Sequence, residues 1–327
     1  MTKHCNQSLL FYYYYYIVLS CLVIYNVQAS SSSSYSSIAN LDKYGNCVQI
    51  KNARLSSLKY GTPIIAAIST TTTNKSGNMD DDKIVVCSIE PSTKYYNQLG
   101  RRIKKKNEGT PVIHFLTPPT SSSNVEGQVV VAMVTSGLQA DGTFLISSLR
   151  RYGIRVWERF DKIPNCHRMA QACSQLFLTF MGYDVENEIS DGIKEVIPSR
   201  DGENPFQMAR PFGVSALLLG IHNNNHQKKN AAEIKFVEPS GIISDSVYAR
   251  ALGKESERAN KLLKEKWKEN MNIQQVKDMC ISIMKEITHQ GDVENKDENA
   301  NDDEAPMLIC EIIHGNGSHE IERIRLL

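Results

Sequence analysis

The dipeptide Gly61-Thr62, within the stretch KYGTPIIAA, has the residue types of an autocleaving hydrolase. Cleavage after Gly61 would free Thr62 as an N-terminal nucleophile, and its new α-amine would act as the base for the hydroxyl. Thr62 could instead be an ordinary residue at the start of a strand. Pro63 favours this second interpretation, because proline lacks an amide donor and restricts the backbone of the residue before it.

Other polar residues lack the spacing that catalysis requires. His114 and His167 have no acid or nucleophile at a recognisable distance along the chain, so we expect them to be structural. Ser136-Gly137 is expected to form a turn rather than a nucleophile elbow, because no G-x-S-x-G motif surrounds it. The cysteines form no C-x-x-C pair, and most beyond the first 40 residues lie in apolar runs. We therefore predict small buried hydrophobes, with no metal site and no cofactor.

The composition is that of an ordinary globular protein, with 41% hydrophobic and 22% charged residues in a chain of 327. This length fits one large domain or two small ones. The net charge of +1 gives no reason to expect a nucleic-acid partner. The basic string RRIKKK, residues 101–106, is expected to be a solvated loop.

The N-terminus has the layout of a targeting leader. Lys3 and His4 precede an uncharged apolar run over residues 9–25, and small residues before Ser30 offer a cleavage site. We expect a signal peptide over residues 1–29 and a flexible Ser-rich linker over 30–37. An uncleaved anchor is the weaker alternative, because the apolar run barely spans a bilayer. A wrongly assigned start codon is another. Membrane contact is expected only through the leader.

Hydrophobic periodicity beyond the linker predicts strands that cluster and helices that come in pairs. Strands are expected at 62–69, 83–89, 111–116, 128–137, 209–221, 232–241 and 306–314. Helices are expected at 48–58, 140–160, 164–181, 256–270 and 272–287. Asp141 and Asn165 are candidate N-terminal caps of the second and third helices. Residues 318–327 are expected to be a tail.

This order of elements predicts an α+β protein built as a four-layer αββα sandwich. Two sheets stacked face to face, each covered on its outer face by a helix pair, bury every apolar face. Polar and acidic stretches at 70–82, 184–203 and 291–305 are expected to be insertions.

Segments of the chain, in this order, resemble proteasome α-type subunits. YGNCVQIKNA (44–53) contains Gly45 and Gln49, and MVTSGLQADGTFLISSLRR (133–151) contains Ser136, Gly137 and Asp141. RPFGVSALLLG (210–220) contains Arg210, Pro211, Phe212 and Gly213, and EPSGIISDSVYARALGKES (238–256) contains Pro239, Gly241, Gly253 and Lys254. The resemblance implies the sandwich of the N-terminal-nucleophile hydrolases, as one domain over 38–327. Within it we expect Arg210 to be a structural cation and Gly213 to permit close backbone approach within the sheet.

The same resemblance implies a structural role rather than catalysis. Proteasome α-type subunits form seven-membered rings on β-type subunits, which hold the threonine sites, and work in ubiquitin- and ATP-dependent protein catabolism. The helix upstream of their first strand is not removed, and VQIKNARLSSL is similar to that helix. Active members place an aspartate at the end of the second strand, where this chain has Cys87, Ser88 and Ile89. Without that carboxylate, nothing orients Thr62 as the family chemistry requires.

Two departures from the α-type pattern concern the gate and the activator. The segment around Tyr35 lacks the Tyr-Asp-Arg motif of gating tails, and the activator-docking lysine has no clear equivalent among Lys104–Lys106. An activator or regulatory particle therefore remains a possible partner only. The family works in cytosol and nucleus, whereas the leader suggests endomembrane entry or a secondary plastid. Two alternatives stay open: an active hydrolase using Thr62, and a lone secreted or anchored binding module.

Overall fold

The structure is a computed structural model. It describes residues 41–44, 47–70, 82–89, 112–117, 129–181, 189, 192–193, 210–224, 229–244, 247–291, 307–314 and 318–325. The predicted leader and linker, most of the three predicted insertions, and Gly45 lie outside the described residues.

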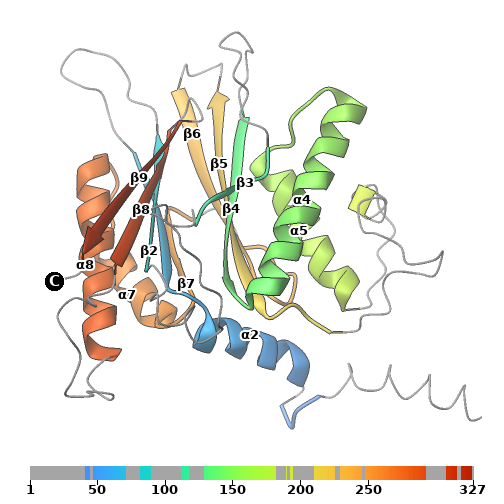
Figure 1. Ribbon diagram of the computed structural model, residues 1–327, viewed down its shortest axis with the longest axis horizontal. Helices are drawn as coiled ribbons and strands as arrows, with labels where there is room; N and C mark the ends of the chain where they lie inside the picture. Colours follow the sequence, from blue (N-terminus) through green and yellow to red (C-terminus); the bar gives the residue numbers. More distant parts are fainter. Residues whose placement is uncertain are drawn as a thin grey trace, which may run out of the picture.

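Two antiparallel sheets form the middle of the molecule (Figure 1). One is a five-stranded sheet of order β7-β1-β2-β8-β9, and the other is four-stranded, of order β3-β4-β5-β6. The first contains β1 (Ile64–Ser69), β2 (Lys83–Ile89), β7 (Ala249–Leu252), β8 (Met307–Ile313) and β9 (His319–Arg325). The second contains β3 (His114–Phe115), β4 (Val129–Gly137), β5 (Val214–Asn224) and β6 (Lys229–Val237).

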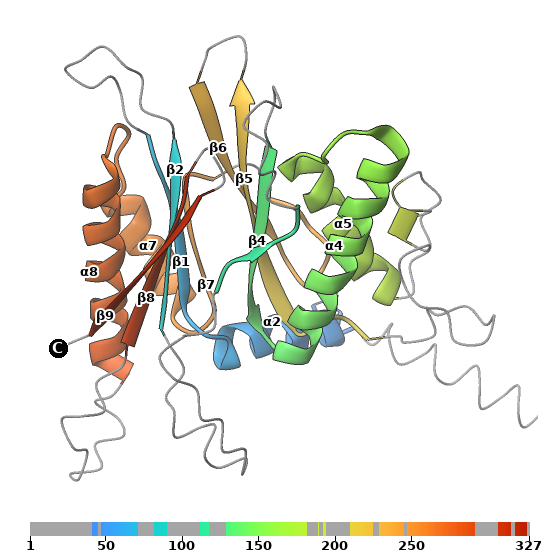
Figure 2. The same cartoon turned by 45° about the horizontal axis from the view of Figure 1, so that its top comes forward.

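Helices cover both outer faces of the sheet pair. Helices α4 (Gln139–Phe160) and α5 (Cys166–Phe180) pack on the four-stranded sheet, while α7 (Ser256–Lys266) and α8 (Ile273–Gly291) pack on the five-stranded sheet. Figure 2 shows the resulting order of layers, helix–sheet–sheet–helix. Helix α2 (Val48–Tyr60) lies across one end of the sandwich, against β4 and β5. The predicted four-layer αββα sandwich is confirmed.

From Ile64 to Ile68, strand β1 packs between the four-stranded sheet and helices α7 and α8 and is apolar on both faces. In β1, Ile64 and Ala66 face the other sheet, while Ile65 and Ala67 face α7 and α8. Because side chains alternate along a strand, a strand buried on both sides appears as a continuous apolar run rather than an alternating one. The continuous apolar runs IIAAIS and KIVVCSI therefore predict buried strands.

Two strands of the structure, β7 and β9, were not predicted from the sequence. The segment predicted as a C-terminal tail is β9, which pairs with β8 from Met307↔Arg325 to Ile313↔His319. Most of its side chains are exposed, so it lacks the apolar alternation of a strand with a buried face. The other is β7, only four residues long, which pairs with β1 at the sheet edge. Its position follows from its partner strand and not from its own pattern.

The predicted caps had different outcomes. Asn165 caps α5, and its side-chain oxygen accepts a hydrogen bond from the Arg168 amide at 2.9 Å. Asp141 does not cap α4; its carboxylate binds Arg210 and the Gly213 amide instead. Ser136 and Gly137 are the last two residues of strand β4, as the strand predicted over 128–137 has them, and they do not form the separate turn that was also expected.

Some predicted bounds shift as well. Arg210 to Gly213 precede β5, which begins at Val214, and α8 extends to Gly291. Among the residues described, no helix is both long enough and apolar enough to span a bilayer.

Candidate functional site at the α2 end of the sandwich

Helix α2 closes the end of the sandwich at which Thr62 lies. Its inward positions are small: Ala53 and Ser57 are its buried residues, and Gly61 follows as the C-terminal cap. Positions four apart lie on one helix face, so these residues form a stripe that lets α2 approach the sheets closely. A Cβ added to Gly61 would lie 2.3 Å from Ser136 Oγ, and no side chain could fit there without displacing its neighbours.

Serine side chains join α2 to the four-stranded sheet. Ser57 Oγ lies 2.8 Å from the Ser136 carbonyl oxygen, to which it donates, and 2.9 Å from Ser215 Oγ. Ser136 and Ser215 stand opposite each other in the β4–β5 register. All three serines are buried, so each hydrogen bond replaces one that water would otherwise make. The helix is therefore an integral part of the sandwich.

The backbone on both sides of the Gly61–Thr62 peptide bond is held in the same network. The Gly61 amide donates to the Ser57 carbonyl at 3.0 Å, and the Gly61 carbonyl accepts from the Lys254 amide at 2.9 Å. Ser136 Oγ donates to the Thr62 carbonyl at 2.7 Å. Freeing the Thr62 amine would break the chain between α2 and β1, in the middle of this network.

Among the described residues, the end of β2 offers Thr62 no aspartate of the kind expected beside a nucleophilic threonine. Thr62 is exposed and precedes β1, which begins two residues later. Ser88 stands opposite Ile64, so a hydroxyl occupies the end of β2 nearest to Thr62. Cys87, the preceding residue, points to the other side, into the apolar layer beneath α8.

A small cavity of about 60 Å³ lies beside this end of α2, lined in part by Ser57, Ser215 and Arg250. Ligand-binding pockets usually measure about 300–1,000 Å³, so this cavity has room for water rather than for a substrate. Among the described residues, no group of His, Cys, Asp and Glu is arranged to hold a metal ion.

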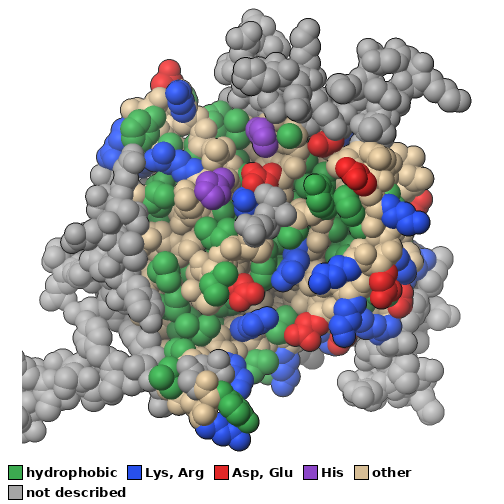
Figure 3. Space-filling view, turned by 180° about the vertical axis from the view of Figure 1, so that it is seen from behind, with side chains coloured by type: hydrophobic (Ala, Val, Ile, Leu, Met, Phe, Trp, Pro, Cys, Tyr) green, Lys and Arg blue, Asp and Glu red, His purple; other side chains and the backbone are tan. Residues whose placement is uncertain are grey.

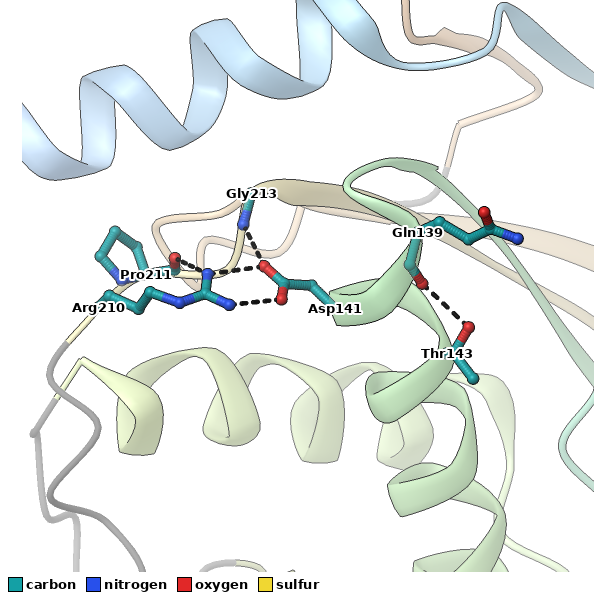
Figure 4. A network of polar contacts seen from close by, with 6 residues as sticks. All are labelled: Gln139, Asp141, Thr143, Arg210, Pro211 and Gly213. Atoms are coloured by element: carbon teal, nitrogen blue, oxygen red, sulfur yellow. Dashed lines mark hydrogen bonds and ion pairs between the residues drawn. The ribbon is translucent and has the colours of Figure 1, made fainter. Parts of the chain in front are cut away.

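Asp141 and Arg210 form a second polar network at the start of α4 (Figure 4). The Arg210 guanidinium donates to both carboxylate oxygens, at 2.6 and 2.8 Å, and the Gly213 amide donates to Asp141 Oδ2 at 2.9 Å. The Asp141 side chain is 5% exposed, whereas that of Arg210 is 50% exposed. This bidentate pair holds the RPFG segment against α4 just before β5 begins.

Electrostatics favour the ionised form of this pair. Burial alone would raise the pKa of Asp141, but hydrogen bonds from Arg210 and the Gly213 amide, together with the guanidinium charge, outweigh it and lower the pKa. The hydrogen bond to Asp141 likewise raises the pKa of Arg210. Asp141 is therefore a charged structural anchor, and the prediction of Arg210 as a cation near a strand start agrees with this geometry.

Close backbone approach depends on Gly137 rather than on Gly213. A Cβ at Gly213 would meet only ordinary contacts, the nearest at 3.5 Å. Gly137 has φ +134°, and a Cβ there would lie 2.3 Å from the Gly213 carbonyl oxygen. The prediction that Gly213 permits close backbone approach was therefore wrong, because the crowded position is Gly137 at the end of β4.

Other predicted residues also lie near this end of the sandwich, and one of them, Pro211, belongs to the second network. Gln49 is in the first turn of α2, and Phe212 packs against Phe177, with ring centroids 5.4 Å apart. Pro239 and Gly241 form the turn after β6, where Gly241 has φ +82°. Pro211 supplies a carbonyl near Arg210, 3.4 Å from Nη1.

The roles of Ser57 and Ser215 were not predicted from the sequence. For Ser57, the small residues at Ala53, Ser57 and Gly61, spaced four apart, could have indicated a closely packed helix face.

Known proteins resemble this chain over part of its length. The family model described as "Proteasome subunit" matches residues 204–300, which include β5, β6, β7 and α7. The chain is 25% identical over 175 residues to proteasome subunit alpha type-5 of Drosophila melanogaster, covering 54% of this chain and 62% of that protein. The chain is a divergent relative of the proteasome alpha-type subunits.

Two further relatives carry the same name. Proteasome subunit alpha type-5 of Trypanosoma brucei brucei is 28% identical over 160 residues, covering 49% of this chain and 55% of the relative. That of Caenorhabditis elegans is 23% identical over 160 residues, covering 49% and 54%. The chain thus spans between about half and two thirds of the length of these relatives. The matched family region contains two of the resembling segments, RPFGVSALLLG and EPSGIISDSVYARALGKES.

Proposed function

We propose that this protein is a non-catalytic alpha-type subunit in the outer ring of a 20S-like proteasome core. The observation that carries the proposal is α2, which is continuous with Thr62 and hydrogen-bonded across the end of the sandwich through Ser57. A hydrolase that uses Thr62 would need this end open and the Gly61–Thr62 bond cleaved. No observation favours that alternative.

The outward face of α2 supports a subunit contact. Leu55 and Tyr60 are 50% and 73% exposed, while the helix buries the small residues Ala53 and Ser57. A helix that served only to cover its own sheet would turn its large apolar side chains inward. Tyr44, just before the helix, is 75% exposed and adds to the same end of the molecule.

The surface also fits a partner of mixed polarity. Figure 3 shows hydrophobic, basic and acidic side chains interspersed over one face, without a large field of one charge. Protein–protein contacts typically combine such groups, whereas nucleic-acid surfaces are strongly basic. We propose other alpha-type subunits as ring neighbours and beta-type subunits as the catalytic partners. The shared name of the relatives favours the ring position of alpha type-5.

Affinity purification of the tagged full-length chain from its own cells, followed by native mass and subunit identification, tests this function. We expect a particle of several hundred kilodaltons that contains alpha- and beta-type chains, in which this protein is not cleaved at Thr62. Recovery at monomer mass would contradict ring membership. A chain beginning at Thr62 on N-terminal sequencing would contradict the non-catalytic role.

A further inference from the structure

Thiols from three elements meet in the apolar layer between the five-stranded sheet and the helices. They are Cys87 in β2, Cys310 in β8 and Cys280 in α8, and all are fully buried. Buried free cysteines commonly act as small hydrophobic side chains, and the sequence predicted that role. Two of these thiols also face each other closely enough to react.

Cys87 and Cys310 are direct cross-strand neighbours. Strands β2 and β8 are antiparallel, and the register places Cys87 opposite Cys310, so both side chains leave the same face of the sheet. Their sulfur atoms lie 2.8 Å apart. Opposed residues in antiparallel strands have Cα atoms about 4.5–5.5 Å apart, within the span of about 4.4–6.8 Å that disulfides bridge. The register and the sulfur separation are therefore compatible with a disulfide between these two residues.

The remaining buried cysteines lack such a partner among the described residues. Cys166 and Cys173 belong to the apolar cluster beneath α4 and α5, on the opposite side of the sandwich. Among the described residues, Cys280 is the third thiol in the same buried cluster as the pair. The geometry therefore favours a Cys87–Cys310 pair, with Cys280 as the alternative partner.

The folded chain protects these thiols from oxidation. Hydrogen bonds to Cys280 and Cys310, followed by burial, raise the pKa of Cys87 well above its ordinary value. Thiol–disulfide exchange proceeds through the thiolate and needs access to the attacking sulfur. Before β8 pairs with β2, the two thiols can ionise and are accessible. After the strands have paired, the thiols are buried and neither condition holds.

We propose that Cys87 and Cys310 form an intramolecular disulfide when the chain folds in the presence of a small disulfide oxidant. One thiolate attacks oxidised glutathione, forms a mixed disulfide and releases one reduced glutathione. The second thiolate then displaces the other, so two thiols are oxidised and one disulfide is reduced. The product joins β8 to β2 across 223 residues of sequence, and this long loop is the part of the unfolded chain that the bond constrains. This inference is independent of the proposed ring function.

The test is refolding of the denatured, reduced full-length chain in a buffer of reduced and oxidised glutathione. Free thiols are then alkylated, and the protein is digested without reductant for peptide mass analysis. We expect one linked peptide pair containing Cys87 and Cys310, in the wild type and in Cys280→Ala. We also expect the linked form to unfold at a higher urea concentration than the reduced form. Chain that is folded before glutathione is added should gain the bond much more slowly.

Variants and alternative pairings make the test decisive. Cys310→Ala should lose the linked pair and become insensitive to the oxidant in its urea midpoint, while Cys173→Ala, in the other core, should behave as the wild type. The wild-type result stands even if Cys310→Ala does not fold. Alkylation of both Cys87 and Cys310 in the refolded wild type, or predominant linkage to Cys280, would overturn the proposal.

Discussion

At the scale of single residues, buried polar groups organise the end of the sandwich that helix α2 closes. Asp141 is nearly fully buried and accepts hydrogen bonds from a guanidinium and a backbone amide. A buried carboxylate is tolerated only where such partners replace water. The consequence is that the RPFG segment is fixed by charge as well as by packing.

Asp141→Asn should weaken this anchor. The amide keeps an acceptor for the Gly213 N–H but loses the charge, so we expect the free energy of unfolding to fall by about 1–3 kcal/mol at neutral pH. Because the folded-state pKa of Asp141 is lowered, the stabilisation is fully present above the unfolded pKa of about 4 and is lost as pH falls through the folded pKa. Urea denaturation of both proteins across this pH range measures the difference.

The control for this substitution is Asp278→Asn, on the exposed face of α8. Asp278 accepts a hydrogen bond from Gln274 at 2.9 Å, which asparagine can also accept. Its stability should stay within about 0.5 kcal/mol of the wild type. An equal loss in both variants would show that the buried pair has no special role.

A matched glycine pair tests the backbone crowding beside the anchor. Gly137→Ala would place a Cβ 2.3 Å from the Gly213 carbonyl at a positive φ, so we expect a loss of about 2 kcal/mol or more. Gly213→Ala, whose Cβ meets atoms no closer than 3.5 Å, should cost clearly less. The measurement is thermal or urea unfolding of both variants, and the reverse order would refute the assignment.

At the scale of elements, the strands of the two sheets are also joined by a buried carboxylate. Glu311 in β8 is 0% exposed and accepts from the amides of Val112 and Ile113, at 2.5 and 3.2 Å, just before β3. His319 Nε2 in β9 lies 2.8 Å from the same carboxylate. One side chain thus connects the short β3 segment to the C-terminal hairpin of the other sheet.

Glu311→Ala should therefore destabilise more than a typical core truncation of a polar residue. It leaves one buried and one partly buried amide without their acceptor, and we expect a loss of about 3–5 kcal/mol in chemical denaturation. Glu311→Gln, which retains one acceptor oxygen, should lose less. The control is Glu320→Gln on β9, where the side chain is 67% exposed and the expected change is within about 0.5 kcal/mol. Similar losses for Glu311→Ala and Glu320→Gln would contradict this connection.

At the scale of the whole molecule, helix α2 forms an outer surface at one end of the sandwich. The helix is anchored by small residues and exposes large apolar side chains, which is unfavourable for an isolated chain but suits an assembled one. The ring-subunit proposal makes α2 a contact between neighbours.

Leu55→Glu should prevent assembly without unfolding the chain. Leu55 is 50% exposed, so a charge costs little in the free protein but would be buried unpaired in a contact. We expect recovery in the large particle to fall at least tenfold, with an unchanged urea midpoint for the free chain. Leu55→Met, which keeps the apolar surface, should assemble normally. Normal assembly of Leu55→Glu would move the ring contact away from this helix.

Much of the fold could be predicted from the sequence because its main elements carry local patterns. Strands such as β1 and β2 are continuous apolar runs, and α8 repeats its apolar residues at helical spacing. The pairing of helices and the clustering of strands led to the αββα order. The blocks from Arg210 to Gly220 and from Glu238 to Ser256 carry the resemblance to proteasome α-type subunits, and both lie within the residues that the proteasome family model matches.

Only the tertiary structure decided which residues meet. Strands β7 and β9 form because a partner strand supplies their hydrogen bonds, and no local pattern reveals such a partner. Asp141 binds Arg210, 69 residues away, instead of capping its own helix, and the crowding assigned to Gly213 belongs to Gly137. The facing of Cys87 and Cys310 depends in the same way on the register of two strands distant in sequence. Local patterns report burial and periodicity, whereas contacts across the chain depend on register and layer order, which exist only in the folded molecule.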